Sequence, residues 1–147
     1  MVDEKVSRLK TPEDCESFAK NVEAKHPQLA LEARRRAVEL KAAKYGATTE
    51  AERQALEAVY ACEAALSHKN GKKTRASRTW QSIQRHGILQ TVERVVSKKR
   101  PTDGYAVLNE MGMADFTFEA VIMRNQSAFT PETVAHAKAR IDEQSEV

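Results

Sequence analysis

A dense group of lysine and arginine side chains is the part of this sequence with the clearest chemical meaning. Residues 69–100 carry ten positive charges and a single acid, Glu93, which is a net charge of +9. The whole chain carries only +3, so all other residues together sum to −6. A concentrated positive surface on an otherwise acidic protein attracts polyanions. This stretch therefore predicts a nucleic-acid-binding surface, on DNA or RNA.

The predicted contacts fall into three groups along this basic stretch. Lysine and arginine neutralise phosphates and position the protein, whereas amide and hydroxyl side chains read base edges. Since few side chains of the second kind are present, namely Gln81, Ser82, Gln84 and Asn70, we expect low sequence specificity. The predicted binding residues are Lys72 and Lys73 in a loop, Arg75, Arg78, Gln81, Ser82 and Arg85 on a helix, and Arg94, Lys98, Lys99 and Arg100 further along.

The charge pattern also supports a second hypothesis, a helical protein–protein interaction or regulatory module. Residues 101–147 carry three cations and eight acids, a net charge of −5. They could cover the basic stretch within one molecule or between two copies, so a homodimer is possible, and an acidic partner protein could do the same. Under this hypothesis, the acidic segment lies over the cations or an apolar patch is exposed.

Residues for catalysis or metal binding are not grouped in the sequence. His68 and Asn70 flank the basic loop, but no general base or metal ligand accompanies them at a suitable spacing. The run Gly71-Lys72-Lys73-Thr74 lacks the upstream glycine and the preceding strand of a phosphate-binding loop. We therefore predict no catalytic residue, no metal ligand and no cofactor, and leave enzymatic activity as a disfavoured alternative.

The two cysteines, Cys15 and Cys62, lie in helical patterns with apolar neighbours, so we expect both to be small buried hydrophobic residues. A disulfide between them is the alternative. The chain opens without a signal-peptide pattern, and its apolar runs are shorter than the roughly 18 residues that a membrane span needs. These features predict a cytoplasmic protein without a membrane partner.

Composition and periodicity predict an all-α fold. Apolar residues make up 41% of the 147-residue chain and charged residues 31%, with few aromatic residues. We expect one domain over residues 10–143, a compact bundle of about six to eight short helices. Its predicted sub-regions are residues 11–69, the basic residues 74–100 and the acidic residues 104–143, with residues 1–9 and 144–147 flexible.

Helix boundaries carry recognisable start signals. Thr11-Pro12 and Thr130-Pro131 each combine a capping threonine with proline in the first turn, and Thr49-x-x-Glu52 is a capping box. Apolar spacing then predicts helices over 12–26, 27–45, 50–68, 77–86, 88–98, 105–111, 115–123 and 131–143. Residues 115–123 are apolar on all sides, which predicts burial, and the alternation at 116–118 leaves a strand as the alternative there.

Two helices joined at Gly87 form the centre of the basic stretch, with the outline of a helix-turn-helix-like unit over residues 74–99. We expect Thr74 or Ser77 to cap the first helix. Trp80 is predicted to be a core residue, with base stacking as the alternative. Along this helix the apolar side comprises Ala76, Trp80 and Ile83, and the basic side comprises Arg75, Arg78, Ser82 and Arg85.

A second cationic run, Arg34-Arg35-Arg36, lies in the predicted helix 27–45. Glu32 and Glu39 are within helical reach and can neutralise these arginines. We therefore interpret the run as a solvated helix face with ion pairs inside the helix, and keep phosphate binding as its alternative.

Overall fold

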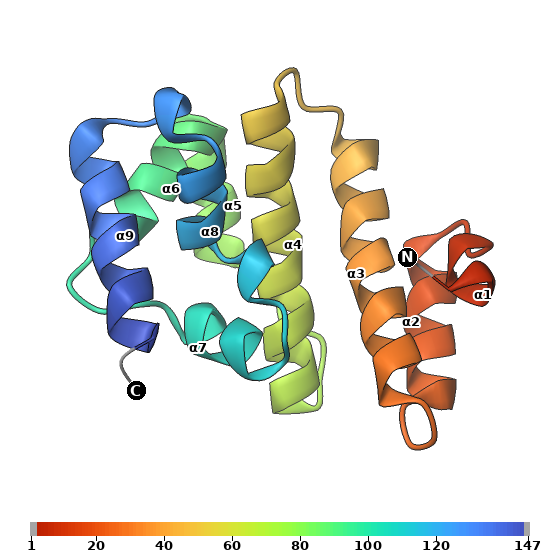
Figure 1. Ribbon diagram of the computed structural model, residues 1–147. Helices are drawn as coiled ribbons and strands as arrows, with labels where there is room; N and C mark the ends of the chain where they lie inside the picture. The colour runs from red at the N-terminus through yellow and green to blue at the C-terminus, as the bar shows by residue number, and fades with distance from the viewer. Residues whose placement is uncertain (1–2, 146–147) are drawn as a thin grey trace. The chain divides into compact units, whose positions relative to one another are not determined.

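Helices account for the regular secondary structure of the computed structural model, which describes residues 3–145 (Figure 1). No strand forms in that range, so the predicted all-α fold class is confirmed. Contacts divide the chain into two compact units, Met1–Ala47 and Thr48–Val147. The first unit contains α1 (Glu4–Ser7), α2 (Pro12–Val22) and α3 (Pro27–Tyr45). The second contains α4 (Glu50–Asn70), α5 (Ser77–His86), α6 (Ile88–Val96), α7 (Asp103–Glu110), α8 (Phe118–Arg124) and α9 (Pro131–Ser145), with 3₁₀ turns η1 (Ala114–Phe116) and η2 (Gln126–Ala128).

The first unit is built on the packing of α2 against α3, with α1 also contacting α3. Its small core combines Val6, Ala19, Ala30 and Ala33, which are all buried. In the described part of residues 1–9, which the sequence predicts to be flexible, α1 forms and its Val6 is buried in this core. Residues 1–2 and 146–147 lie outside the described range, and residues 144–145 belong to α9.

The predicted capping signals are confirmed. The Thr11 side chain accepts a hydrogen bond from the Asp14 backbone N–H at 3.1 Å, and Thr130 accepts from the Thr133 N–H at 3.2 Å. Thr49 accepts from the Glu52 N–H at 3.1 Å and donates to the Glu52 carboxylate. Each bond satisfies one of the backbone donors that the first turn of a helix leaves open.

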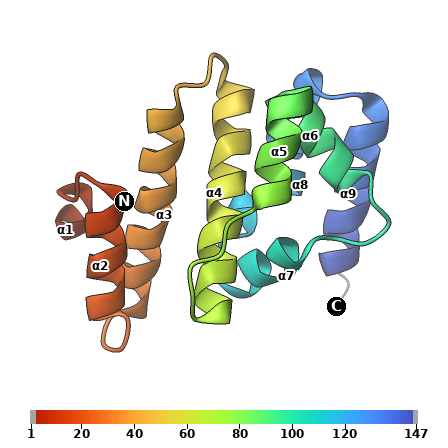
Figure 2. The same cartoon turned by 180° about the vertical axis from the view of Figure 1, so that it is seen from behind.

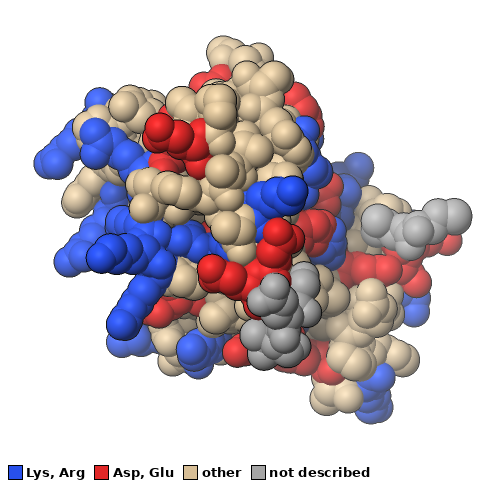
Figure 3. Space-filling model, turned by 60° about the vertical axis from the view of Figure 1, so that its left-hand side comes forward, with Lys and Arg blue, Asp and Glu red and all other residues tan. Residues whose placement is uncertain are grey.

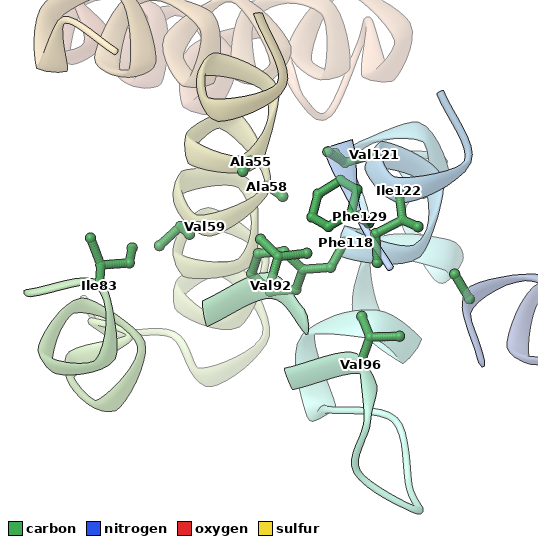
Figure 4. Packing of buried hydrophobic residues seen from close by; sticks show 11 residues of the cluster. Ala55, Ala58, Val59, Ile83, Val92, Val96, Phe118, Val121, Ile122 and Phe129 are labelled. Carbon is green, nitrogen blue, oxygen red and sulfur yellow. The ribbon is translucent and has the colours of Figure 1, made fainter. Parts of the chain in front are cut away.

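The second unit has a continuous hydrophobic core in which α4 contacts α6, α7 and α8, and α8 also contacts α9. Figure 4 shows side chains of this core, which come from α4, α5, α6, α8 and the segment before α9. Ile83 attaches α5 to it, while Val92 and Val96 attach α6. The other members are Ala55, Ala58, Val59, Phe118, Val121, Ile122, Phe129 and Ala137.

The start of α7 and the chain between α7 and α8 differ from two predictions. Thr102 caps α7 through the Tyr105 N–H, so the helix begins at Asp103 and not at residue 105, and Gly104 lies inside it. A Cβ at Gly104 would lie 1.9 Å from Cys62 Sγ, so glycine is needed there for close packing of α7 on α4. Residues 116–118 form the end of η1 and the start of α8, so the strand alternative is wrong.

Helices long and apolar enough to span a lipid bilayer do not occur in residues 3–145.

Candidate nucleic-acid interface

The helices α5 and α6 form a pair joined by one residue, Gly87. Gly87 has a φ of 88°, a backbone conformation that favours glycine. Ser82 of α5 and Thr91 of α6 share a hydrogen bond of 2.9 Å, and Thr91 also donates to the Gly87 carbonyl at 2.8 Å. In Figure 2, the Gly87 turn lies at one end of this helix pair. The segment that leads into α5 and the segment that follows α6 lie at the other end.

This pair differs from a DNA-reading helix-turn-helix, which has a longer turn and reads bases with its second helix. Here the second helix, α6, buries Thr91, Val92 and Val96. Its exposed polar side chains include Gln90 and Arg94. The first helix, α5, carries the more extensive polar and basic surface, in agreement with the sequence pattern.

The start of α5 is fixed by an acid from α4. Glu63 Oε2 accepts hydrogen bonds from the Ala76 backbone N–H at 2.8 Å and from Trp80 Nε1 at 2.7 Å. The prediction that Thr74 or Ser77 caps this helix is wrong, since Ala76 occupies the N-cap position without a side-chain cap. Instead, Thr74 accepts through its backbone carbonyl from Ser67 and donates through its N–H to the same hydroxyl. A carboxylate at a helix N-terminus also interacts favourably with the helix dipole.

Trp80 is a packing residue, as predicted. Its ring is tilted by 54° against that of Tyr60, with the two centroids 5.1 Å apart. It is partly buried against the core of the second unit, and its indole N–H is bonded to Glu63. The base-stacking alternative would require the ring to leave these contacts.

The exposed side of α5, opposite Trp80 and Ile83, carries two arginines and one glutamine. Arg78 and Arg85 lie one turn on either side of Ser82, and Arg94 lies one turn after Thr91. Because Ser82 and Thr91 are bonded, these three arginines flank one seam between the helices. We call the exposed set the basic face: Arg78, Gln81, Arg85 and Arg94. Gln84 is also exposed, but it lies one turn after Trp80 and therefore outside this face.

The remaining predicted residues are also largely exposed. Ser82 is the exception, because it is half-buried and its hydroxyl is bonded to Thr91. Figure 3 shows lysine and arginine side chains gathered along the left-hand edge of one side of the molecule. The exposed cations outside the basic face are Lys72, Lys73 and Arg75 before α5, and Lys98, Lys99 and Arg100 after α6.

Acidic side chains do not neutralise this surface in the part of the chain that the structure describes. Arg75 lies 3.9 Å from Glu63, but its side chain remains 65% exposed. Among residues 3–145, no acidic side chain lies within ion-pair distance of the three arginines of the basic face or of the Lys98–Arg100 cluster. Their guanidinium and ammonium groups are available to a ligand.

Two charged side chains, the half-buried Glu93 and the buried Arg140, hold this surface in place, and the sequence pattern does not identify either role. Glu93, the acid of the basic stretch, accepts from the Thr130 N–H at 2.9 Å and the Thr133 hydroxyl at 3.1 Å, so it faces α9. Arg140 of α9 donates to the Lys98 carbonyl at 2.6 Å and to Glu119 at 2.9 Å. Arg140 thereby fixes the chain just where the Lys98–Arg100 cluster begins.

Both cysteines are buried and reduced, so the prediction of small buried residues is confirmed. Burial raises the pKa of Cys62 to about 12 and also raises the pKa of Cys15. Neither thiol forms a reactive thiolate near neutral pH. Among the described residues, His, Cys, Asp and Glu do not gather in a group of three that could hold a metal ion.

Comparisons with protein-family models, with curated proteins and with solved structures found no match to this chain. Function is therefore argued from the surface itself.

Proposed function

We propose that the second unit is a nucleic-acid-binding module whose basic face and flanking cations contact phosphates. The observation that carries this proposal is the set of exposed arginines on α5 and α6 without acidic neighbours in the described part of the chain. In an ordinary solvated helix, cations of this density are interleaved with acids at neighbouring turns. Here phosphate is the ligand that satisfies them, and counterion release drives binding.

The alternative, a protein-interaction or regulatory module, has less support. It requires the acidic residues 101–147 to lie over the cations, yet Glu119 is buried against Arg140 and faces the core side. It could instead use an exposed apolar patch. Among described residues, Tyr45 of the first unit is the exposed large hydrophobic side chain. A homodimer and a cytoplasmic location stay predictions.

The first experiment measures affinity for labelled duplex DNA, single-stranded DNA and RNA across a range of salt concentrations. If about five cations touch duplex phosphates, the slope of log K against log salt is about −4 to −5. Arg78→Ala/Arg85→Ala should weaken binding to every sequence and make this slope shallower by about 2.

The matched control is Lys20→Ala/Lys25→Ala, which removes the same charge from exposed positions of the first unit. This control variant should bind nucleic acid like the wild type if affinity depends on where the cations lie and not on the net charge of the protein. Equal losses in the two variants, or no binding by the wild type at low salt, would overturn the proposed function. Sedimentation of the wild type alone and with acidic proteins then tests the alternative.

A further inference from the structure

The aromatic side chain closest to the basic face along the chain is already engaged in packing. Proteins that bind single strands stack bases on exposed aromatic rings. Trp80 instead packs against Tyr60 and donates its indole N–H to Glu63, away from the side of α5 that carries Arg78, Gln81 and Arg85. The basic face therefore offers positive charge and an amide to a ligand, and no stacking platform among its own residues.

The basic face is also held rigidly. Glu63 anchors the start of α5, the Ser82–Thr91 hydrogen bond joins its middle to α6, and Ile83 is buried in the core. A preorganised array loses little entropy when it binds a ligand whose charges are themselves fixed in space. The phosphates of a duplex meet this condition, whereas those of a flexible single strand do not.

The spacing of the two α5 arginines suits a groove of a duplex. Arg78 and Arg85 are seven residues apart. At about 1.5 Å of rise per residue, their Cα atoms lie roughly 10 Å apart along the helix axis. The major groove of B-form DNA is about 12 Å wide, so the two guanidinium groups can reach phosphates on both of its edges.

One residue between those arginines fits the edges of bases in the same groove. Gln81 is exposed and lies three residues after Arg78 and four before Arg85, so it shares their side of α5. Glutamine pairs with adenine, and arginine with guanine, on their major-groove edges. The major groove of an RNA duplex is too deep and narrow for a helix surface to read.

We propose that the basic face binds double-stranded DNA across its major groove, with Arg78 and Arg85 on phosphates and Gln81 toward base edges. This inference rests on the proposed function and narrows its ligand to one polymer. It gives the base-edge role to Gln81 and not to Ser82, whose hydroxyl is used between the helices.

The test measures the affinity of the wild-type protein for three ligands. These are a mixed-sequence DNA duplex, one strand of that duplex alone, and an RNA duplex of the same sequence. We expect the DNA duplex to bind at least about tenfold more tightly than either competitor, because only it matches both the fixed charges and the groove. The fluorescence of Trp80, the single tryptophan, should stay unchanged at saturation.

A second measurement separates base contacts from phosphate contacts. Gln81→Ala keeps every charge, so this variant should retain its mean affinity for a random pool of duplexes. The spread of affinities between individual sequences should become smaller. Gln28→Ala, at an exposed position of the first unit, is the control and should leave the spread unchanged.

The possible results distinguish a failure of the duplex-DNA inference from a failure of the proposed function. Equal or tighter binding to the single strand or to the RNA duplex, or quenching of Trp80 by bases, overturns the choice of duplex DNA while nucleic-acid binding stands. An unchanged spread of affinities in the glutamine variant overturns the groove contacts. No binding to any of the three polymers overturns the proposed function, and the inference fails with it.

Discussion

Two arginine-rich helices of this protein look alike in sequence and differ in what their side chains are doing. In α3, Arg36 donates to the Leu9 carbonyl at 2.7 Å and Arg34 pairs with Glu23 at 3.1 Å. In α5, Arg78 and Arg85 are exposed and, among the described residues, without an acid in reach. The first set holds its own unit together, and the second set is available to a ligand.

The number of arginines in a helix is therefore a poor guide to nucleic-acid binding. Whether an arginine is available to a ligand depends on whether its side chain already has a partner within the protein. The prediction of a solvated α3 face with ion pairs inside the helix is wrong for Arg34 and Arg36, which are half-buried. Glu23, just after α2, is the partner of Arg34, and the Leu9 carbonyl, before α2, is the partner of Arg36, so neither partner lies in α3. Glu63 of α4, which lies against the start of α5, accepts hydrogen bonds from the Ala76 backbone N–H and from the Trp80 indole N–H. It anchors the helix without covering its outer side.

The largest effect is expected at Arg140, the most buried of the structural arginines. Arg140→Ala leaves Glu119 without its partner at a site where both side chains are under 10% exposed. Removing one member of a buried pair lowers the free energy of unfolding by about 3–5 kcal/mol. Urea unfolding followed by Trp80 fluorescence measures this, with the exposed Lys138→Ala on the same helix as control. Equal effects of the two substitutions would show that the pair is not structural.

A smaller loss of stability is expected at Arg36. Arg36→Ala removes a partly buried hydrogen bond from a charged donor to the Leu9 carbonyl, worth about 1.5–3 kcal/mol. Because the first unit has no tryptophan, amide hydrogen exchange in α2 and α3 is the suitable measurement. The exposed Lys44→Ala should change exchange little. DNA affinity should be unaffected by either, and a loss on Arg36→Ala alone would place a binding residue in the first unit.

The opposite pattern is expected at Arg78. Arg78→Ala removes an exposed side chain, so the free energy of unfolding should change by less than about 0.5 kcal/mol. Affinity for duplex DNA should nevertheless fall roughly tenfold near 0.1 M salt, as one phosphate contact is lost. Paired urea and binding titrations on the same preparation check both. A destabilised Arg78→Ala protein would mean that this arginine is structural after all.

The smallest effect concerns the exposed pair of Arg53 and Glu50 at the start of α4. Its hydrogen bond to Arg53 lowers the pKa of Glu50 from 4.5 to about 2. A carboxyl whose pKa is lowered by folding stabilises the protein above its unfolded pKa, and this contribution disappears as pH falls from 4.5 toward 2. The stability difference between wild type and Glu50→Gln should therefore shrink over that window. A difference independent of pH would contradict the assignment.

Local signals in the sequence determined the helices and their starts. Thr11, Thr49 and Thr130 cap helices through bonds to the third residue after each of them, so the information lies within one turn. The basic stretch and the apolar side of α5 were visible for the same reason, because helical periodicity places them. The all-α class and the division of α5 into a packed and an exposed side follow from these patterns.

Tertiary structure alone decided which charges are available. Glu63 reaches Ala76 across 13 residues, and Arg140 reaches Lys98 across 42. No periodic pattern encodes such pairs, because each depends on how separate helices meet. Contacts of the same kind act on α5. The Ser82–Thr91 hydrogen bond takes Ser82 out of the exposed surface, and the bond to Glu63 engages Trp80 in packing. The arginines of α5 are left without acidic neighbours among the described residues. A sequence specifies where a charge lies on its helix, whereas the fold specifies whether another part of the chain has already used it.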